Sequence, residues 1–123
     1  MDSTFNLPAR HAMSLCREIG RSQLKVSFFG SNINPIHLDS GLPEEMVRAG
    51  FRSVTCTAES ASDRVLMGMR KGFKRQQAVQ VAKQFQHVGL RVFWMFLIGG
   101  PGENQDTVEE TLEFIHRETG PGD

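Results

Sequence analysis

The segment FWMFLIGGPGENQDT (residues 93–107) passes from an unbroken apolar run into a loop of glycine and proline, and then into a polar stretch. This pattern predicts a strand, a tight turn and the start of a helix. We expect the strand at 91–98, apolar on both faces as in a buried parallel strand, and the helix at 106–117. A β–α unit is therefore expected around this loop.

The rest of the chain alternates in the same way. Its patterns predict, in order, a helix at 8–19, a strand at 24–29, a short helix at 43–49, a strand at 51–57, a helix through 69 with Ser60 and Asp63 as a capping box, and a helix at 76–88. Such alternation implies a parallel sheet with right-handed crossovers. Three strands are too few for a barrel of eight strands or a doubly wound sheet of about five or more. We therefore expect a single α/β domain, residues 1–123, that is a piece of a larger sheet.

Composition excludes several classes of partner. The 123 residues include 14 basic and 14 acidic side chains, so the formal net charge is zero. No electrostatic argument supports a nucleic-acid or anionic-membrane partner. The longest apolar run, 92–98, is too short to cross a bilayer, and the N-terminal MDSTFNLPAR has no signal-peptide pattern. We expect a cytoplasmic protein.

The two cysteines, Cys16 and Cys56, lie far apart in apolar-patterned elements. A disulfide or a metal pair is an alternative, but reduced core cysteines are favoured. The four histidines form no short ligand spacing with one another or with a cysteine. The sequence therefore indicates no self-sufficient metal site.

The glycine loop does not fit the common phosphate-binding motifs. It lacks the lysine and Ser/Thr of a Walker A loop, and Gly99, Gly100 and Gly102 do not have the dinucleotide spacing. Glu103 would also repel a pyrophosphate. An uncharged heterocycle such as adenine, or a ribose, suits the loop better. The alternative, which the loop taken alone favours, is a plain β–α turn with Glu103 stabilising the helix N-terminus.

Three segments, in collinear order, resemble the radical S-adenosylmethionine (radical SAM) superfamily. DSTF (2–5) is similar to its Asp-x-Thr-Phe segment after the second barrel strand. LPEEMVRAGFRSVTCTAESASDRVLMGMRKG (42–72) is similar to its block through the fourth strand. FLIGGPGE (96–103) is similar to its fifth-strand pattern G-x-I-x-G-x-x-E, with Phe96 where the first glycine often sits. The likeness spans nearly the whole chain and is closest to the Fe–S oxidoreductase type often linked to a cobalamin-binding domain.

The resemblance implies a partial TIM-like barrel fragment, with about three parallel strands and helices largely on one face. It implies a parent enzyme that cleaves S-adenosylmethionine reductively with a [4Fe–4S] cluster, and it allows methyl or methylthio transfer and a cobalamin in the parent. The family's C-x-x-x-C-x-x-C cluster loop is not in the chain and would lie upstream of Asp2. We therefore expect no cluster on this chain and no catalysis by it alone.

The resemblance also implies four contacts with the methionine and ribose parts of the cofactor. Asp2 would contact the amino group, Glu59 and Ser60 would lie near the ribose and methionine, and Lys71 would approach the carboxylate. Two of these residues have structural alternatives. Glu59 is also a natural helix-start acid, and Lys71 also fits a solvated basic face.

On the adenine side, the resemblance implies packing on Ile98 and Gly100, where glycine allows close backbone approach. Glu103 would hold the loop rather than perform chemistry. Ile98 is expected in the core in either case. Trp94 and Phe96 are interpreted as packing residues rather than a substrate platform.

Helices on one face would leave the other face of the sheet as an apolar patch, so we expect a homo-oligomer that buries it. The leading functional hypothesis is a segment of a radical SAM enzyme. The alternatives are a non-catalytic, truncated α/β domain that self-associates and an unrelated nucleoside-binding α/β module.

Overall fold

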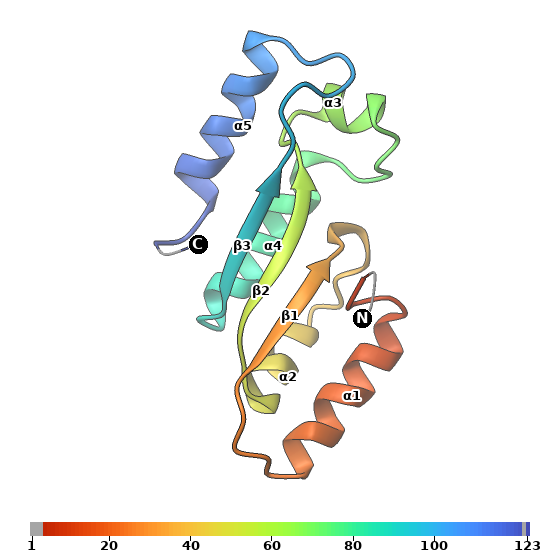
Figure 1. The fold of residues 1–123 in the computed structure, drawn as a ribbon, viewed down its shortest axis with the longest axis vertical. Coiled ribbons are helices and arrows are strands. Elements are labelled where there is room, and N and C mark those ends of the chain that lie inside the picture. The colour runs from red at the N-terminus through yellow and green to blue at the C-terminus, as the bar shows by residue number, and fades with distance from the viewer. Residues whose placement is uncertain (1–3, 122) are drawn as a thin grey trace.

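A computed structural model describes residues 4–121 and 123. The elements are, in chain order, α1 (Ala9–Arg21), β1 (Phe28–Ile33), a 3₁₀ turn η1 (Pro35–His37), α2 (Leu42–Ala49), β2 (Phe51–Glu59), α3 (Asp63–Gly68), α4 (Arg75–His87), β3 (Arg91–Phe96) and α5 (Gln105–Glu118). The strands form one parallel sheet in the order β1-β2-β3 (Figure 1). The expected α/β fold with three parallel strands is confirmed. In the described part of the chain, no helix combines the length and apolarity needed to cross a membrane.

The helices cover one face of the sheet. In Figure 1, α2 and α4 lie behind the strands, and α1 and α5 flank them. On the covered face, Val54 and Cys56 of β2 are fully buried, whereas Phe29, Phe93 and Met95 on the other face are 45–55% exposed. We call this second face, which also carries Ser53, Thr55 and Thr57, the open face. The expectation that β3 is buried on both faces is wrong, because no described element covers its open side.

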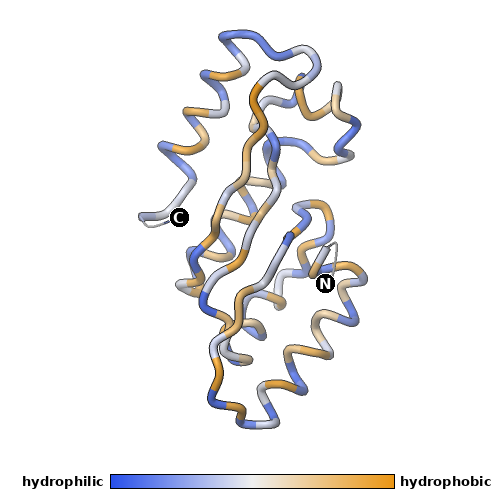
Figure 2. The backbone as a smooth tube through the Cα atoms, in the orientation of Figure 1, coloured by the Kyte–Doolittle hydropathy of each residue, from blue (hydrophilic) through white to orange (hydrophobic). Residues whose placement is uncertain are grey.

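Amphipathic helices build the core. Figure 2 shows hydrophobic and hydrophilic residues alternating along α1 and α5, while β3 is hydrophobic along most of its length. Met46 of α2 and Phe85 of α4 pack with the covered face in the larger core cluster. Phe114 of α5 anchors a smaller cluster with Trp94 and Phe96. The expected packing role of these two aromatic side chains is confirmed by ring contacts to Phe114, with centroids 5.1 and 6.1 Å apart.

The boundaries of all three strands differ from expectation. The second strand ends at Glu59 rather than 57. The first strand was expected at 24–29 but lies at Phe28–Ile33. Pairing with β2 begins only at Phe28, opposite Phe51, so the apolar residues before it have no strand to pair with. The last strand ends at Phe96 rather than 98, because the chain turns into the glycine loop. Ile98 is 72% exposed, so its expected place in the core is wrong.

The expected capping box of Ser60 and Asp63 is also wrong. Helix α3 begins at Asp63 with Ser62 as its N-cap residue. The hydroxyl of Ser60 instead accepts a hydrogen bond from the Ser62 N–H (3.1 Å) and lies 3.3 Å from the Thr111 hydroxyl of α5. Ser60 is thus a buried link between the end of β2 and α5.

Candidate functional site

Polar side chains gather where β1 and β2 end. A hollow of about 220 Å³ lies at this edge of the sheet. Its lining includes Thr4, Asn32, Asn34, Thr57, Glu59, Lys71 and Phe73. The carboxyl ends of parallel strands are where α/β proteins usually place their ligand sites. The hollow is therefore the best-placed candidate site in the described chain.

Glu59 and Lys71 form an ion pair at the hollow. The Lys71 ammonium donates to the Glu59 carboxylate at 2.7 Å, and the two side chains are only 30% and 20% exposed. Lys71 is held by a turn in which its own N–H bonds to the Leu66 carbonyl (3.0 Å). The structure thus brings together two residues predicted from the sequence, and Lys71 is not on a fully solvated face.

The backbone is unusual at the ends of both strands. Asn32 has φ 63° and Glu59 has φ 65°, both in the left-handed region. The pairing register is irregular at the same places, between Gly30 and Ile33 and between Thr57 and Glu59. Non-glycine residues in this region cost free energy, and such strain concentrates at functional sites. Because of these irregularities, the two side chains do not follow the regular alternation between the two faces of the sheet.

Asn32 is joined to β2 by hydrogen bonds across the open face. Its N–H donates to the Thr55 hydroxyl (2.7 Å), and the Thr57 hydroxyl donates to its side-chain oxygen (2.6 Å). Asn32 is not among the site residues predicted from the sequence, because the first strand was expected four residues earlier than it lies. The signal that could have found it is the alternation of hydroxyl side chains along β2, which marks a polar stripe on one face.

The N-terminal segment is tied to the same edge of the sheet. Asn6, which is fully buried, donates from its side chain to the Asn34 carbonyl (2.9 Å) and accepts from the Asn34 N–H (2.8 Å). Phe5 donates its N–H to the Asn32 carbonyl (3.2 Å). These bonds fix the chain that follows β1 and help shape the hollow.

The glycine loop follows β3 and packs on α3. The Glu103 carboxylate accepts a hydrogen bond from the Gly99 N–H, and the Glu103 N–H donates to the Gly100 carbonyl (3.1 Å). Glu103 therefore holds the loop closed, as expected. A Cβ on Gly100 would lie 3.1 Å from a methyl carbon of Val65. The close approach that this glycine permits is thus to the protein's own helix, and the adenine contact stays a prediction.

The seven predicted site residues are therefore divided. The hollow holds Glu59 and Lys71, and the loop holds Ile98, Gly100 and Glu103. The hydroxyl of Ser60 is directed towards α5 instead. Asp2 lies outside the described residues.

The cysteines lie away from this polar edge. Both are buried and unbonded, which confirms the prediction of reduced core thiols. Burial raises the pKa of the Cys56 thiol to about 12, and burial together with the charge of Glu45 raises that of Cys16 to about 11. Within residues 4–121 and 123, no three His, Cys, Asp or Glu side chains are grouped so that they could hold a metal ion.

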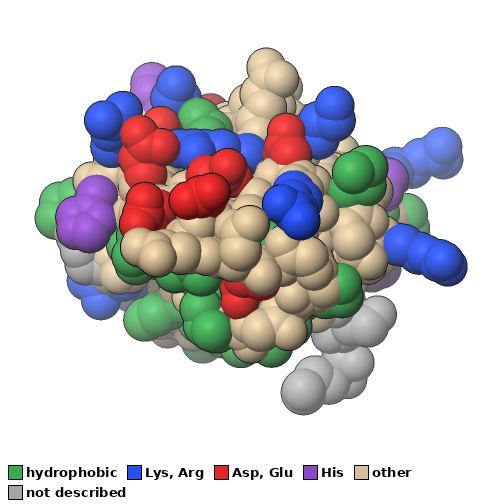
Figure 3. All heavy atoms as spheres, turned by 90° about the horizontal axis from the view of Figure 1, so that it is seen from above, with side chains coloured by type: hydrophobic (Ala, Val, Ile, Leu, Met, Phe, Trp, Pro, Cys, Tyr) green, Lys and Arg blue, Asp and Glu red, His purple; other side chains and the backbone are tan. Residues whose placement is uncertain are grey.

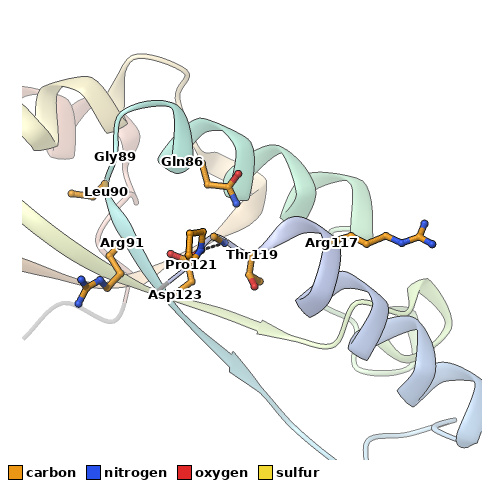
Figure 4. A pocket seen from close by; sticks show the side chains of 9 residues that line it. Gln86, Gly89, Leu90, Arg91, Arg117, Thr119, Pro121 and Asp123 are labelled. Carbon is orange, nitrogen blue, oxygen red and sulfur yellow. Dashed lines mark hydrogen bonds between the residues drawn. The ribbon is translucent and has the colours of Figure 1, made fainter.

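A second cavity, of about 450 Å³, lies at the other end of β3 (Figure 4). The side chains of Arg91 and Arg117 extend away from each other in this view. Gln86 donates to the Glu118 carbonyl (2.6 Å), and Asp123 accepts from the Val92 N–H (3.1 Å), so these polar groups hold the chain together. This cavity has no convergent charged groups, and the hollow at the strand ends is the stronger candidate.

Comparison with known proteins gives the family context. The sequence model of the radical SAM superfamily matches residues 5–115. The uncharacterized methyltransferase PH0819 of Pyrococcus horikoshii is 30% identical over 118 residues, which make up 95% of this chain and 25% of that protein.

Two solved structures have the same fold. The radical S-adenosylmethionine methyltransferase TsrM of Kitasatospora setae, with cobalamin and a [4Fe–4S] cluster bound, aligns with a TM-score of 0.84 at 22% identity over 94% of this chain and 24% of its own. The cobalamin-dependent S-adenosylmethionine radical enzyme OxsB aligns with a TM-score of 0.69 at 17% identity, over 89% of this chain and 17% of its own. The chain thus spans about a quarter or less of the length of these relatives.

Proposed function

The chain belongs to the radical SAM superfamily, and we propose that it forms part of the S-adenosylmethionine site of a methyltransferase of that family. The observation that carries the proposal is the Glu59–Lys71 ion pair, at the hollow where β1 and β2 end. The methyltransferase activity is inferred from the similarity to PH0819 and TsrM, both of which are described as methyltransferases. Because the chain spans a quarter of these proteins, the activity is proposed for the longer enzyme.

The donor set at the hollow fits S-adenosylmethionine. The cofactor carries a carboxylate, an ammonium group, ribose hydroxyls and an adenine ring. Lys71 would donate to the carboxylate, and Glu59 would accept from the ammonium group or a ribose hydroxyl. The two charges neutralise each other when no ligand is present, which limits the cost of holding them partly buried.

When bound, S-adenosylmethionine supplies the reactive group, and this chain's part is to bind and orient it. Asn32, held by Thr57, keeps the wall of the hollow in place beside Glu59. The left-handed backbone at Glu59 directs its carboxylate towards Lys71. Both charges are thus set in position before a ligand arrives, which lowers the entropic cost of binding.

The described residues do not fit an iron–sulfur cluster. Cluster ligands are thiolates, whereas Cys16 and Cys56 are buried and burial raises the pKa of both thiols. We therefore assign this chain no step that involves the cluster. Inactivity of the isolated chain is part of the proposal, since its described residues offer no ligands for that cofactor.

The proposal is tested by titrating the ¹⁵N-labelled chain with S-adenosylmethionine to about 5 mM, a range that detects weak binding. We expect the amide signals of Glu59 and Lys71 to shift most. Glu59→Gln and Lys71→Met should each weaken binding at least about tenfold, the loss typical of a charge-assisted hydrogen bond. The matched exposed controls Glu110→Gln and Lys83→Met should bind as the unmodified chain does.

Two outcomes would contradict the proposal. One is the absence of shifts near the hollow, or equal losses in the control variants. The other is an equal response to adenosine, which lacks the methionine part that Glu59 and Lys71 are proposed to bind. That second result would favour a plain nucleoside-binding module.

A further inference from the structure

A groove on the outer side of α3 is larger than the hollow and separate from it. Its volume is about 840 Å³, and it is lined by α3, the turn that follows and the first turn of α4. Phe73 forms a buried part of its wall, at 6% exposure, and Met67 stands on α3 with 76% of its surface exposed. The groove thus combines a buried aromatic wall with an exposed methionine, a side chain that adapts its shape readily to a partner.

The groove carries unbalanced positive charge. Arg64, Arg70 and Lys74 line it and are exposed. Across residues 4–121 and 123, none of the three side chains forms an ion pair. The one acidic group in the lining, Asp63, accepts a hydrogen bond from the Arg75 N–H (2.7 Å). Two neighbouring cations, by contrast, are paired with acidic side chains: Lys71 with Glu59, and Arg75 with Glu113.

From these features we propose that the groove docks an acidic amphipathic helix of a separate partner protein. The partner's carboxylates would pair with Arg64, Arg70 and Lys74, and one or two of its apolar side chains would pack between Met67 and Phe73. Complementary charge of this kind sets the orientation and the rate of association. The apolar contact supplies the free energy of binding.

The shape of the groove favours a helix over a small molecule. It is open to solvent along α3 instead of enclosing its contents, as the 76% exposure of Met67 shows. Small-molecule sites bury most of the ligand surface. An open groove with an exposed methionine and a charged rim is instead typical of helix-in-groove recognition. Figure 3 views the molecule from the end where α3 lies in Figure 1, and both basic and acidic side chains are visible on this face.

The groove is distinct from the proposed cofactor site, although the two are adjacent. Phe73 lines both of them. Lys71 points to Glu59 and the hollow, whereas Arg70 on one side and Lys74 on the other line the groove. Substitutions at Arg64, Met67 and Lys74 therefore test docking without altering the ion pair at the hollow.

The test uses fluorescence anisotropy with a labelled acidic amphipathic peptide of about 18 residues, or about five helical turns. The peptide carries leucine at i, i+3, i+4 and i+7 spacing and glutamate on its remaining surface. We expect saturable binding to the 123-residue chain at low salt. Arg64→Glu with Lys74→Glu should weaken it at least about tenfold, because two charge pairs become repulsive. Met67→Ser should weaken it about threefold or more through lost apolar contact.

Matched controls separate docking from general charge effects. Arg10→Glu with Lys25→Glu makes the same change in net charge at exposed positions outside the groove, and Met95→Ser removes an exposed methionine from the open face. Both should bind the peptide within about twofold of the unmodified chain. Equal losses in groove and control variants would overturn the proposal. So would no binding up to about 1 mM peptide, or self-association of the chain that disappears in the Arg64→Glu, Lys74→Glu variant.

Discussion

The Lys71 ammonium lies 2.7 Å from the Glu59 carboxylate, and the pair joins the turn after α3 to the end of β2. Because both side chains are largely shielded, removing one charge leaves the other poorly solvated. We expect Glu59→Gln and Lys71→Met each to lower the free energy of unfolding by about 1–2 kcal/mol, between the values for surface and buried pairs. The double variant should lose less than the sum. Urea unfolding of all four proteins checks this, and additive losses would show that the pair contributes no coupling.

A second prediction concerns two helical glycines with opposite surroundings. A Cβ on Gly68 would lie 2.8 Å from the Pro101 carbonyl oxygen. For a Cβ on Gly20, the nearest neighbour would be the Arg48 carbonyl oxygen, at an ordinary contact distance of 3.8 Å. Gly20→Ala should therefore stabilise the protein by about 0.5–1 kcal/mol through helix propensity. Gly68→Ala should destabilise it by about 1–3 kcal/mol, because the glycine loop must move away. Thermal unfolding gives both signs, and stabilisation by Gly68→Ala would contradict the close packing of this loop on α3.

The smaller core cluster gives a third prediction. Phe114 is fully buried and contacts the rings of Trp94 and Phe96. Phe114→Ala should cost about 3–5 kcal/mol, whereas Phe114→Leu should cost less because it leaves a smaller cavity. Guanidinium unfolding followed by Trp94 fluorescence reports directly on this cluster. Similar stabilities for Phe114→Ala and the unmodified protein would mean that α5 is not anchored by this contact.

The order of the elements could be predicted from the sequence because apolar residues recur at helical spacing in the helices and form short apolar or alternating runs in the strands. The helices before and after each strand, and the three strands, were all expected in the right order. Boundaries were less predictable where tertiary pairing decides them. The run at 24–29 is apolar enough for a strand, yet the start of the strand is set by where Phe28 meets Phe51. The sequence of the segment alone does not show which residue of the neighbouring strand it will pair with.

The candidate site was predictable in part for a similar reason. Glu59 and Lys71 came from the family resemblance, and the structure joins them. Asn32 was missed because its role depends on a left-handed backbone conformation and on Thr57 of the neighbouring strand. Exposure of Ile98 was missed because strand β3 ends two residues before it. Both depend on how the chain leaves a strand, which hydrophobic periodicity does not report.

The buried cysteines give a fourth prediction, for alkaline pH. The pKa of Cys56 is raised by burial from 9.0 to about 12, and that of Cys16 by burial and by Glu45 to about 11. Above pH 9 the unfolded chain releases these protons while the native protein retains them, so stability should fall as pH rises from about 9 to 12. The chain contains no tyrosine, which removes one other source of alkaline titration. Urea unfolding across this range gives the free energy of unfolding as a function of pH. This free energy should fall less steeply in the Cys16→Ala, Cys56→Ala double variant. An equally steep fall in that variant would show that the two thiols are not its cause.

The open face gives the last prediction. Parallel sheets are nearly always covered on both faces, yet Phe29, Phe93 and Met95 are about half exposed and the rings of Phe29 and Phe93 lie 6.1 Å apart across β2. We therefore expect the isolated chain to self-associate through this face, with a sedimentation coefficient that rises between about 1 and 100 μM, the range of a micromolar dimer. Phe93→Ser with Met95→Ser should hold the protein monomeric, because it removes the apolar area that drives association. Met67→Ser, which removes an exposed methionine from α3, should leave the association unchanged. A monomer at every concentration, or equal loss of association with Met67→Ser, would show that this face is not the interface.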